Sequence, residues 1–282
     1  MNITIFEKKN MTAYYDLDWN RHVNSRTYEK FAYASRMQIL NDYGYPISKM
    51  LDQEDKWISL SSKVRFLSQQ FENSILTVKT ELNRDKKDQL HFYHHIQDSS
   101  GIPVCNVWNV SALTNCKGES ITIDSVLLTD DRNKLYDVNL DERNPSWITL
   151  THNYDIPFTD MNSFWNLPTD SIWKIFEEGR FLFFNEVLDL GLIKKIDTSS
   201  FFMGGEIEMI ELPKPGTKVI IHSWIDTVEK IRFYFRQDIV SQDGRILVRM
   251  RDEQLFVALS TSRPRKAPPE FLEQVGKYIR QK

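Results

Sequence analysis

The alternation of apolar and polar positions along the chain predicts a long helix followed by strands. In the first half, apolar and small residues recur at the three-and-four spacing of one helix face: Tyr28, Phe31, Ala32, Ser35 and Ile39. This helix is expected to end near Gly44. Four runs rich in Val, Ile and aromatic residues follow, at residues 57–67, 75–82, 90–96 and 104–113. They predict an antiparallel sheet that the helix covers on one face.

The second half repeats this order. A helical pattern covers residues 169–190, and strand patterns cover 206–210, 219–225, 231–240 and 246–259. Residues 16–36 align with residues 160–180 at an offset of 144, with Asp and Arg kept at the two ends. Turn residues recur 143 positions apart, as the pairs Asn73/Gly216 and Gly101/Gly244. The chain is therefore predicted to be a tandem repeat.

The boundary between the repeats falls in a charged segment. Residues 129–145 contain eight charged side chains in seventeen positions, which is typical of an exposed connector. We therefore predict an α+β protein with domains at residues 1–130 and 146–282 and a linker at 131–145. Each domain is expected to hold a strand, a long central helix and a four-stranded antiparallel meander wrapped around that helix. Joining the two sheets edge to edge would bury their edge strands.

Composition and charge narrow the class of protein. The chain has 282 residues, 41% apolar and 27% charged, with a formal net charge of −3, so it can form an ordered core and shows no global attraction for nucleic acid. No apolar run approaches the length of a membrane span. Cys105 and Cys116 lack the spacing of metal ligands or of a disulfide framework. The N-terminal residues become charged too early for a secretion signal, which favours a cytoplasmic location.

The segment before the first helix contains the candidate chemistry. Polar residues occupy every second position and would project to one side of an extended chain: Asp16, Asp18, Asn20, His22 and Asn24. One interpretation is structural, with Asn24 or Ser25 capping the helix and His22 satisfying a backbone group. The other is catalytic: a carboxylate beside the positive end of a helix can act as a base or nucleophile while helix N–H groups stabilise an oxyanion.

Residues 15–28, with Phe31 and Arg36 behind them, resemble the segment that leads into the central helix of hotdog-fold thioesterases. The resemblance is to the 4-hydroxybenzoyl-CoA and acyl-ACP thioesterase types, whose pattern is close to D-x-D-x-N-x-H-V-N-N-x-x-Y. It covers the chain twice, because acyl-ACP thioesterases are double hotdogs of similar length. Residues 257–268 are also similar to the usual close of a hotdog domain. The resemblance implies tandem hotdog domains.

The resemblance also implies an activity, the hydrolysis of an acyl thioester of coenzyme A or of acyl carrier protein. It places Asp18 at the family's catalytic aspartate and Asn20 and His22 at the two groups that assist it. Helix N–H groups around Asn24 and Ser25 would then bind the substrate carbonyl. No metal or cofactor is implied, since coenzyme A or phosphopantetheine enters only as part of the substrate.

Two departures from the family pattern keep alternatives open. Gln69 stands where acyl-ACP thioesterases carry a further glutamate; it cannot act as a base and is assigned, with Asn24 and Ser25, to substrate binding. The family keeps its intact motif in the second repeat, whereas here that copy has Asn162 and Asn166 at the positions of Asp18 and His22. The runner-up function is therefore a non-catalytic protein that binds acyl-CoA or acyl-ACP, and a dehydratase on the same fold ranks third. A homodimer of whole chains stands beside a monomer.

Overall fold

The computed structural model describes residues 5–18, 21–131, 135–188, 190–214 and 216–280. The chain divides into two compact units. The first comprises Met1–Val138 and Thr159–Trp173, and the second comprises Asn139–Phe158 and Lys174–Lys282. Residues 159–173, which the sequence offset assigns to the second repeat, thus have most of their contacts in the first unit.

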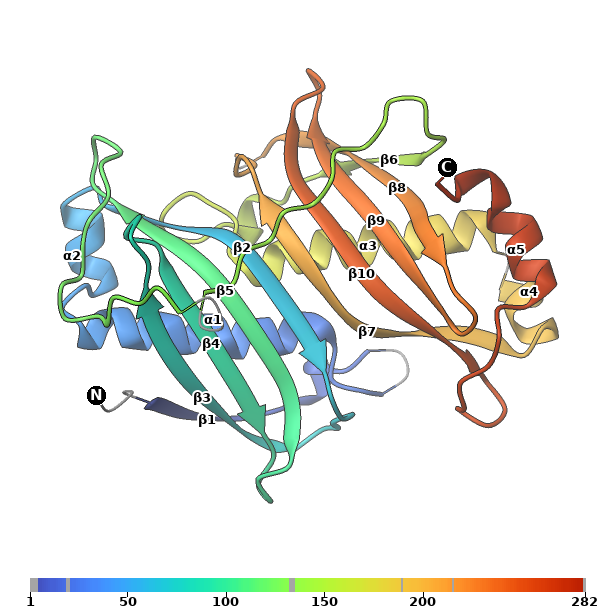
Figure 1. Ribbon diagram of the computed structural model, residues 1–282, viewed down its shortest axis with the longest axis horizontal. Coiled ribbons are helices and arrows are strands. Elements are labelled where there is room, and N and C mark those ends of the chain that lie inside the picture. The colour runs from blue at the N-terminus through green and yellow to red at the C-terminus, as the bar shows by residue number, and fades with distance from the viewer. Residues whose placement is uncertain (1–4, 19–20, 132–134, 189, 215, 281–282) are drawn as a thin grey trace. The chain divides into compact units, whose positions relative to one another are not determined.

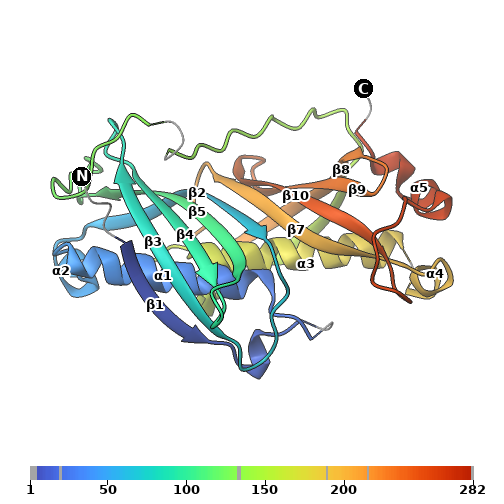
Figure 2. The same cartoon turned by 60° about the horizontal axis from the view of Figure 1, so that its bottom comes forward.

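The first unit contains one long helix on an antiparallel sheet. Its described strands are β1 (Ile5–Met11), β2 (Lys56–Phe66), β3 (Ile75–Arg84), β4 (Leu90–Gln97) and β5 (Pro103–Thr114). Their order in the sheet is β1-β3-β4-β5-β2. Helix α1 (Ser25–Asp42) lies along one face of this sheet, and the short helix α2 (Ile47–Asp52) follows it (Figures 1 and 2).

The predicted four-stranded meander is wrong in its strand order. β2 follows the helix in sequence but pairs with β5, whereas β3 pairs with β1 and β4. The lengths of the connections explain this. Short turns at residues 85–89 and 98–102 join β3 to β4 and β4 to β5, whereas the connection at residues 67–74 is long enough to cross the sheet, at about 3.3 Å per residue.

The second unit has the same strand order. Its described strands are β6 (Leu150–Asp155), β7 (Thr198–Met209), β8 (Lys218–Val228), β9 (Arg232–Ser241) and β10 (Ile246–Ala258), arranged β7-β10-β9-β8-β6. Helix α3 (Thr169–Val187) packs on this sheet over its part from Lys174 onward, where the Phe183 ring lies 5.0 Å from the Phe235 ring. The helices α4 (Leu190–Lys195) and α5 (Pro269–Val275) were not predicted, and β7 begins eight residues earlier than its prediction.

Local sequence accounts for the boundaries of these elements. The Asn24 side chain caps α1 by accepting a hydrogen bond from the Thr27 N–H at 3.0 Å, and Gly44 follows the helix at a φ of +85°. Positive φ angles also occur at both predicted turn pairs: 59° at Asn73, 65° at Gly216, 79° at Gly101 and 89° at Gly244. The repeated turns therefore have the same backbone conformation in both units.

The sequence predicted an exposed connector between the repeats. In the structure, part of this connector is buried. Val138 and Leu140 are each only 5% exposed. In the second unit, Arg249 donates to the Leu140 carbonyl oxygen at 3.4 Å and Arg236 to the Asp141 carbonyl oxygen at 2.8 Å. Buried apolar positions alternating with bonded backbone groups hold this segment to the sheet. Within the described residues, no helix is long and apolar enough to span a membrane.

Candidate functional site

Asp18 lies in a tight turn directly before α1. The Asp18 N–H donates to the His22 carbonyl oxygen at 2.7 Å, and the Arg21 N–H donates to the Asp18 carbonyl oxygen at 3.0 Å. The Asp18 carboxylate accepts the His22 N–H at 3.0 Å. Arg21 has a φ of +66°, which closes the turn. The side chain of Asp18 is thus held in one place while it stays partly exposed to solvent.

Asp16 fixes this turn to the helix. Asp16 is 4% exposed, and its carboxylate accepts hydrogen bonds from the Ala13 N–H at 2.9 Å and the Thr27 hydroxyl at 3.2 Å. The Lys30 ammonium lies 3.4 Å away, and the Asn24 N–H donates to the Asp16 carbonyl oxygen at 2.9 Å. Asp16 therefore has a structural part, joining the short 3-10 turn Tyr14–Asp16 to the first turn of α1.

The remaining predicted site residues take different positions. His22 is partly buried, with its ring 5.6 Å from the ring of Phe71 in an edge-on contact. Gln69 lies in the same connection as Phe71 and is exposed. Ser25 is buried at the first position of α1. Asn20 lies outside the described residues.

Asn24 takes the structural part that the sequence offered as an alternative. Its side-chain oxygen accepts hydrogen bonds from the Thr27 N–H at 3.0 Å and from the Thr27 hydroxyl at 2.9 Å. That oxygen is therefore engaged in capping α1. The positive end of the helix nevertheless lies next to the Asp18 turn, as a catalytic arrangement requires.

The second repeat contains a turn of the same construction. The Asn162 N–H donates to the Asn166 carbonyl oxygen at 3.0 Å, and the Asn166 N–H donates to the Asn162 side-chain oxygen at 3.3 Å. Trp165, with a φ of +57°, takes the place of Arg21. The hydrogen bonds of the two turns are therefore equivalent at the 144-residue offset.

The side chains of the second turn form different hydrogen bonds from those of the first. Asn162 donates to the Tyr33 hydroxyl at 3.1 Å, and Asn166 donates to the Trp57 carbonyl oxygen at 3.3 Å. Two amides here tie the turn to α1 and β2, at the positions where the first turn has a carboxylate and an imidazole. Neither amide can act as a general base.

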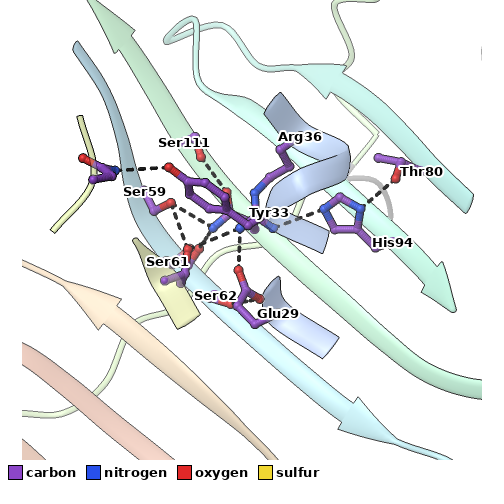
Figure 3. A network of polar contacts seen from close by, with 12 residues as sticks. Glu29, Tyr33, Arg36, Ser59, Ser61, Ser62, Thr80, His94 and Ser111 are labelled. Carbon is purple, nitrogen blue, oxygen red and sulfur yellow. Dashed lines mark hydrogen bonds and ion pairs between the residues drawn. The ribbon is translucent and has the colours of Figure 1, made fainter. Parts of the chain in front are cut away.

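A buried polar cluster between α1 and the sheet was missed by the sequence reasoning (Figure 3). Glu29 and Arg36 form an ion pair on α1, and both are 0% exposed. Arg36 also donates to His94 Nε2 at 3.2 Å and to the Thr169 hydroxyl at 3.3 Å. Since arginine only donates, His94 Nε2 is an acceptor and Nδ1 carries the proton that bonds to Thr80 at 2.7 Å.

Electrostatics agree with this assignment. Burial, together with the positive charge of Arg36, holds the pKa of His94 well below its usual value, so the ring stays neutral. Burial raises the pKa of Asp170, at the start of α3, and the nearby Glu29 carboxylate adds to the rise. The sequence did contain a signal for the cluster. Glu29 and Arg36 are about two helical turns apart, and His94 shares one face of β4 with the buried Phe92 and Ile96.

Within the described residues, no group of three or more His, Cys, Asp and Glu side chains is placed to hold a metal ion. The arrangement at α1 instead offers a carboxylate, an imidazole nearby in sequence and a helix N-terminus. Such a set can hydrolyse an activated acyl group without a metal.

The fold is that of hotdog-fold thioesterases, and comparison with solved structures identifies similar chains. A Lactobacillus plantarum protein described as an oleoyl thioesterase matches with a TM-score of 0.67 and 12% identity, over 95% of this chain and 98% of that one. The 12:0-ACP thioesterase of Umbellularia californica matches with a TM-score of 0.66 and 12% identity, over 93% and 94%. An acyl-ACP thioesterase of Bacteroides thetaiotaomicron matches with a TM-score of 0.62 and 12% identity, over 89% and 97%.

At the level of sequence, neither a protein-family model nor a curated protein matches the chain. The structural likeness extends over nearly the whole length of each compared protein. At 12% identity it establishes the fold, while the activity has to be argued from the residues of this chain.

Proposed function

We propose that the protein is an acyl thioester hydrolase acting on acyl-CoA or acyl-ACP. The observation that carries the proposal is the Asp18 turn, which holds a partly exposed carboxylate beside the N-terminus of α1. The fold likeness to acyl-ACP thioesterases supports the same class of reaction. We also carry forward tandem hotdog domains at residues 1–130 and 146–282, with sheets joined edge to edge, a cytoplasmic location and no cofactor.

In the proposed reaction, Asp18 takes a proton from water as the water oxygen attacks the thioester carbonyl carbon. The carbon–sulfur bond then breaks, the proton passes to the leaving thiolate, and the products are a carboxylic acid and a thiol. Direct attack by the Asp18 carboxylate, followed by hydrolysis of the anhydride, is the nucleophilic variant. Asn20 and His22 are assigned to holding the reactants.

The developing oxyanion needs a donor from the first turn of α1. The Asn24 N–H already donates to the Asp16 carbonyl oxygen, and the Thr27 N–H donates to the Asn24 side chain. We therefore assign the role to the backbone N–H of Arg26, aided by the positive end of the helix.

A thiol-trapping assay with acyl-CoA and acyl-ACP substrates tests the proposal, using Asp18→Asn as the variant. The second repeat indicates that an amide keeps this turn, because Asn162 accepts the equivalent N–H at 3.3 Å. Asp18→Asn should therefore fold normally and lose about 10²- to 10⁴-fold in kcat, the usual contribution of a general base.

The matched control is Asp42→Asn, the same chemical change at the exposed far end of α1. Its rate should equal that of the unmodified protein. If Asp18→Asn keeps most of the activity, the site assignment is wrong. If the protein releases no thiol from any substrate but is thermally stabilised by acyl-CoA, the non-catalytic binding alternative holds instead.

A further inference from the structure

The space between α1 and the sheet of the first unit is crossed by a layer of ionised and polar groups. The Glu29 carboxylate pairs with Arg36 and accepts a hydrogen bond from the Ser62 hydroxyl of β2 at 3.3 Å. Arg36 bridges to His94 on β4, at 3.2 Å. Figure 3 shows these side chains meeting between the helix and the strands. We call Glu29, Arg36 and His94 the polar layer.

Further hydroxyl and amide groups extend the polar layer across the sheet. Asn109 on β5 donates to the Ser61 carbonyl oxygen at 3.0 Å and to the Ser59 hydroxyl at 3.3 Å, and it accepts from Ser111. Ser59 in turn lies 3.3 Å from the Thr169 hydroxyl, which also bonds to Arg36. Because its members hydrogen-bond to one another in a medium of low dielectric constant, the network resists displacement.

The polar layer begins close to the candidate site. Glu29 is four residues from the start of α1 at Ser25, about 6 Å along the helix axis. An apolar cluster of this unit lies farther along the helix, with Ile39 and Leu40 packed among Trp57 and Phe92. An alkyl chain with its carbonyl at the N-terminus of α1 first meets a short apolar stretch, where the Tyr28 ring lies 5.3 Å from the Phe66 ring. It then meets the charged groups, which separate this stretch from the apolar cluster around Ile39.

An alkyl chain cannot take over the hydrogen bonds of the groups it displaces. Glu29, Arg36 and His94 are each 0% exposed, so separating them leaves charges that neither water nor the ligand can satisfy. Breaking a buried pair in this way is among the most unfavourable changes a protein interior can undergo. The polar layer therefore closes the interior of the first unit to a long acyl chain.

We propose that the polar layer determines the substrate class of the Asp18 site, restricting it to thioesters of short acyl groups, butyryl or smaller. The inference rests on the proposed function and adds a chain length to it. It differs from the 12:0 and oleoyl groups named for two of the compared proteins, whose likeness to this chain is one of fold.

The first measurement is the chain-length profile of the unmodified protein. Acetyl-, butyryl-, octanoyl- and lauroyl-CoA are compared by kcat/KM in the thiol-trapping assay, each with Asp18→Asn as the blank. Butyryl-CoA should exceed lauroyl-CoA by at least about 100-fold, the lower end of the discrimination expected from disrupting a buried ion pair.

The second measurement removes both charges together, as Glu29→Ala with Arg36→Ala, so that neither is left unpaired. The lauroyl-to-butyryl ratio of kcat/KM should rise at least about tenfold, because one tenfold step is what an apolar contact of modest size supplies. Should that variant fail to fold, Glu29→Val with Arg36→Met keeps more of the buried volume and carries the same expectation.

The matched control removes the corresponding pair of the second unit, as Arg180→Ala with Asp252→Ala, and should leave the chain-length profile unchanged. A profile of the unmodified protein that peaks at octanoyl or lauroyl, and that depends on Asp18, overturns the inference and leaves the proposed function standing. So does a folded double variant with the original profile. If no thioester is hydrolysed in an Asp18-dependent way, the proposed function fails and the inference fails with it.

Discussion

The two units keep an arginine at the same place of the repeat but pair it with different buried carboxylates. In the first unit, Arg36 pairs with Glu29, on the same helix. In the second unit, Arg180, 144 residues later, pairs with Asp252 on β10 at 2.6 Å. Each carboxylate is 0% exposed in its side chain. Both repeats therefore contain the ion pair, but its carboxylate comes from the helix in one and from a strand in the other.

The residues at the positions equivalent to Asp252 and Glu29 explain why the acidic partner differs. At the place of Asp252 the first unit has Asn109, 143 residues earlier, which is neutral and bonds to neighbouring strand groups. At the place of Glu29 the second repeat has Trp173, which is 1% exposed and apolar. A buried guanidinium requires one carboxylate, and either the helix or the strand can supply it. The comparison shows that each arginine keeps one carboxylate partner, although the residue that supplies this carboxylate differs between the repeats.

The largest expected effect comes from leaving each carboxylate without its arginine. Arg36→Leu should lower the free energy of unfolding by about 3–5 kcal/mol, because Glu29 is then a buried charge without its partner. Arg180→Leu should lower it by roughly 2 kcal/mol, because Asp252 keeps a hydrogen bond from Gln254 at 3.1 Å and burial already raises its pKa. Urea denaturation, followed by circular dichroism, measures both.

Adding Glu29→Leu to Arg36→Leu provides the control, because an apolar pair of similar volume often replaces a buried ion pair without loss. The double variant should recover at least half of the lost stability. Equal losses for Arg36→Leu and Arg180→Leu would remove the difference drawn between the units.

A second prediction concerns the opposite face of the two sheets. Burial raises the pKa of Asp238 to about 6, and neither of its buried oxygens has a hydrogen bond partner. The equivalent residue of the first unit, His95, is bonded to Asn106 at 2.7 Å. Because the folded state binds the Asp238 proton more tightly than the unfolded state, the contribution of Asp238 to stability falls as pH rises between about 4 and 6. The fall should be about 3 kcal/mol.

Asp238→Asn isolates this contribution, since other carboxyl groups also titrate in the same range. The measurement is the change in free energy of unfolding between about pH 4 and pH 7, compared between the unmodified protein and the variant. The unmodified protein should lose more stability over this interval than the variant does. The same pH dependence in both proteins would show that Asp238 is solvated as freely as an exposed carboxyl group.

The smallest predicted effect concerns the helix cap at the candidate site. Asn24→Ala should lower the free energy of unfolding by about 1 kcal/mol, because the Thr27 N–H loses its side-chain acceptor. Asn24→Ser, which can still cap, should recover most of this. Thermal denaturation with kinetics on the same samples tests the assignment, and a loss of kcat in Asn24→Ser without a loss of stability would give Asn24 a direct catalytic part.

Local patterns predicted most of the secondary structure, because helix and strand periodicity is a property of neighbouring residues. The helix pattern at 169–190 became α3 at Thr169–Val187, and the strand pattern at 90–96 became β4 at Leu90–Gln97. The repeated turns were predicted from Asn73 and Gly101, whose positive φ angles depend on local sequence. Short helices such as α2 were not predicted, because six residues contain too little periodicity to indicate a helix.

The candidate site was predictable only in part. The motif located Asp18 before a helix, and the sequence offered Asn24 or Ser25 as its cap, since both features depend on the residues immediately around them. The structure shows Asn24 in that role. The catalytic assignments of Asp18, Asn20 and His22 stay predictions. Nothing in the local sequence indicated that Asn162 would bond to Tyr33, 129 residues away.

By itself, the sequence determined the repeat, the helices and strands that compose it and the turns between them, because these follow from contacts between residues near one another in the chain. The tertiary structure decided the strand order, with β2 beside β5, and the partners of the buried charges. A buried charge must be neutralised, but sequence spacing does not say by which element. Only the packed chain shows Glu29 meeting Arg36 and His94 in the first unit, and Asp252 meeting Arg180 in the second.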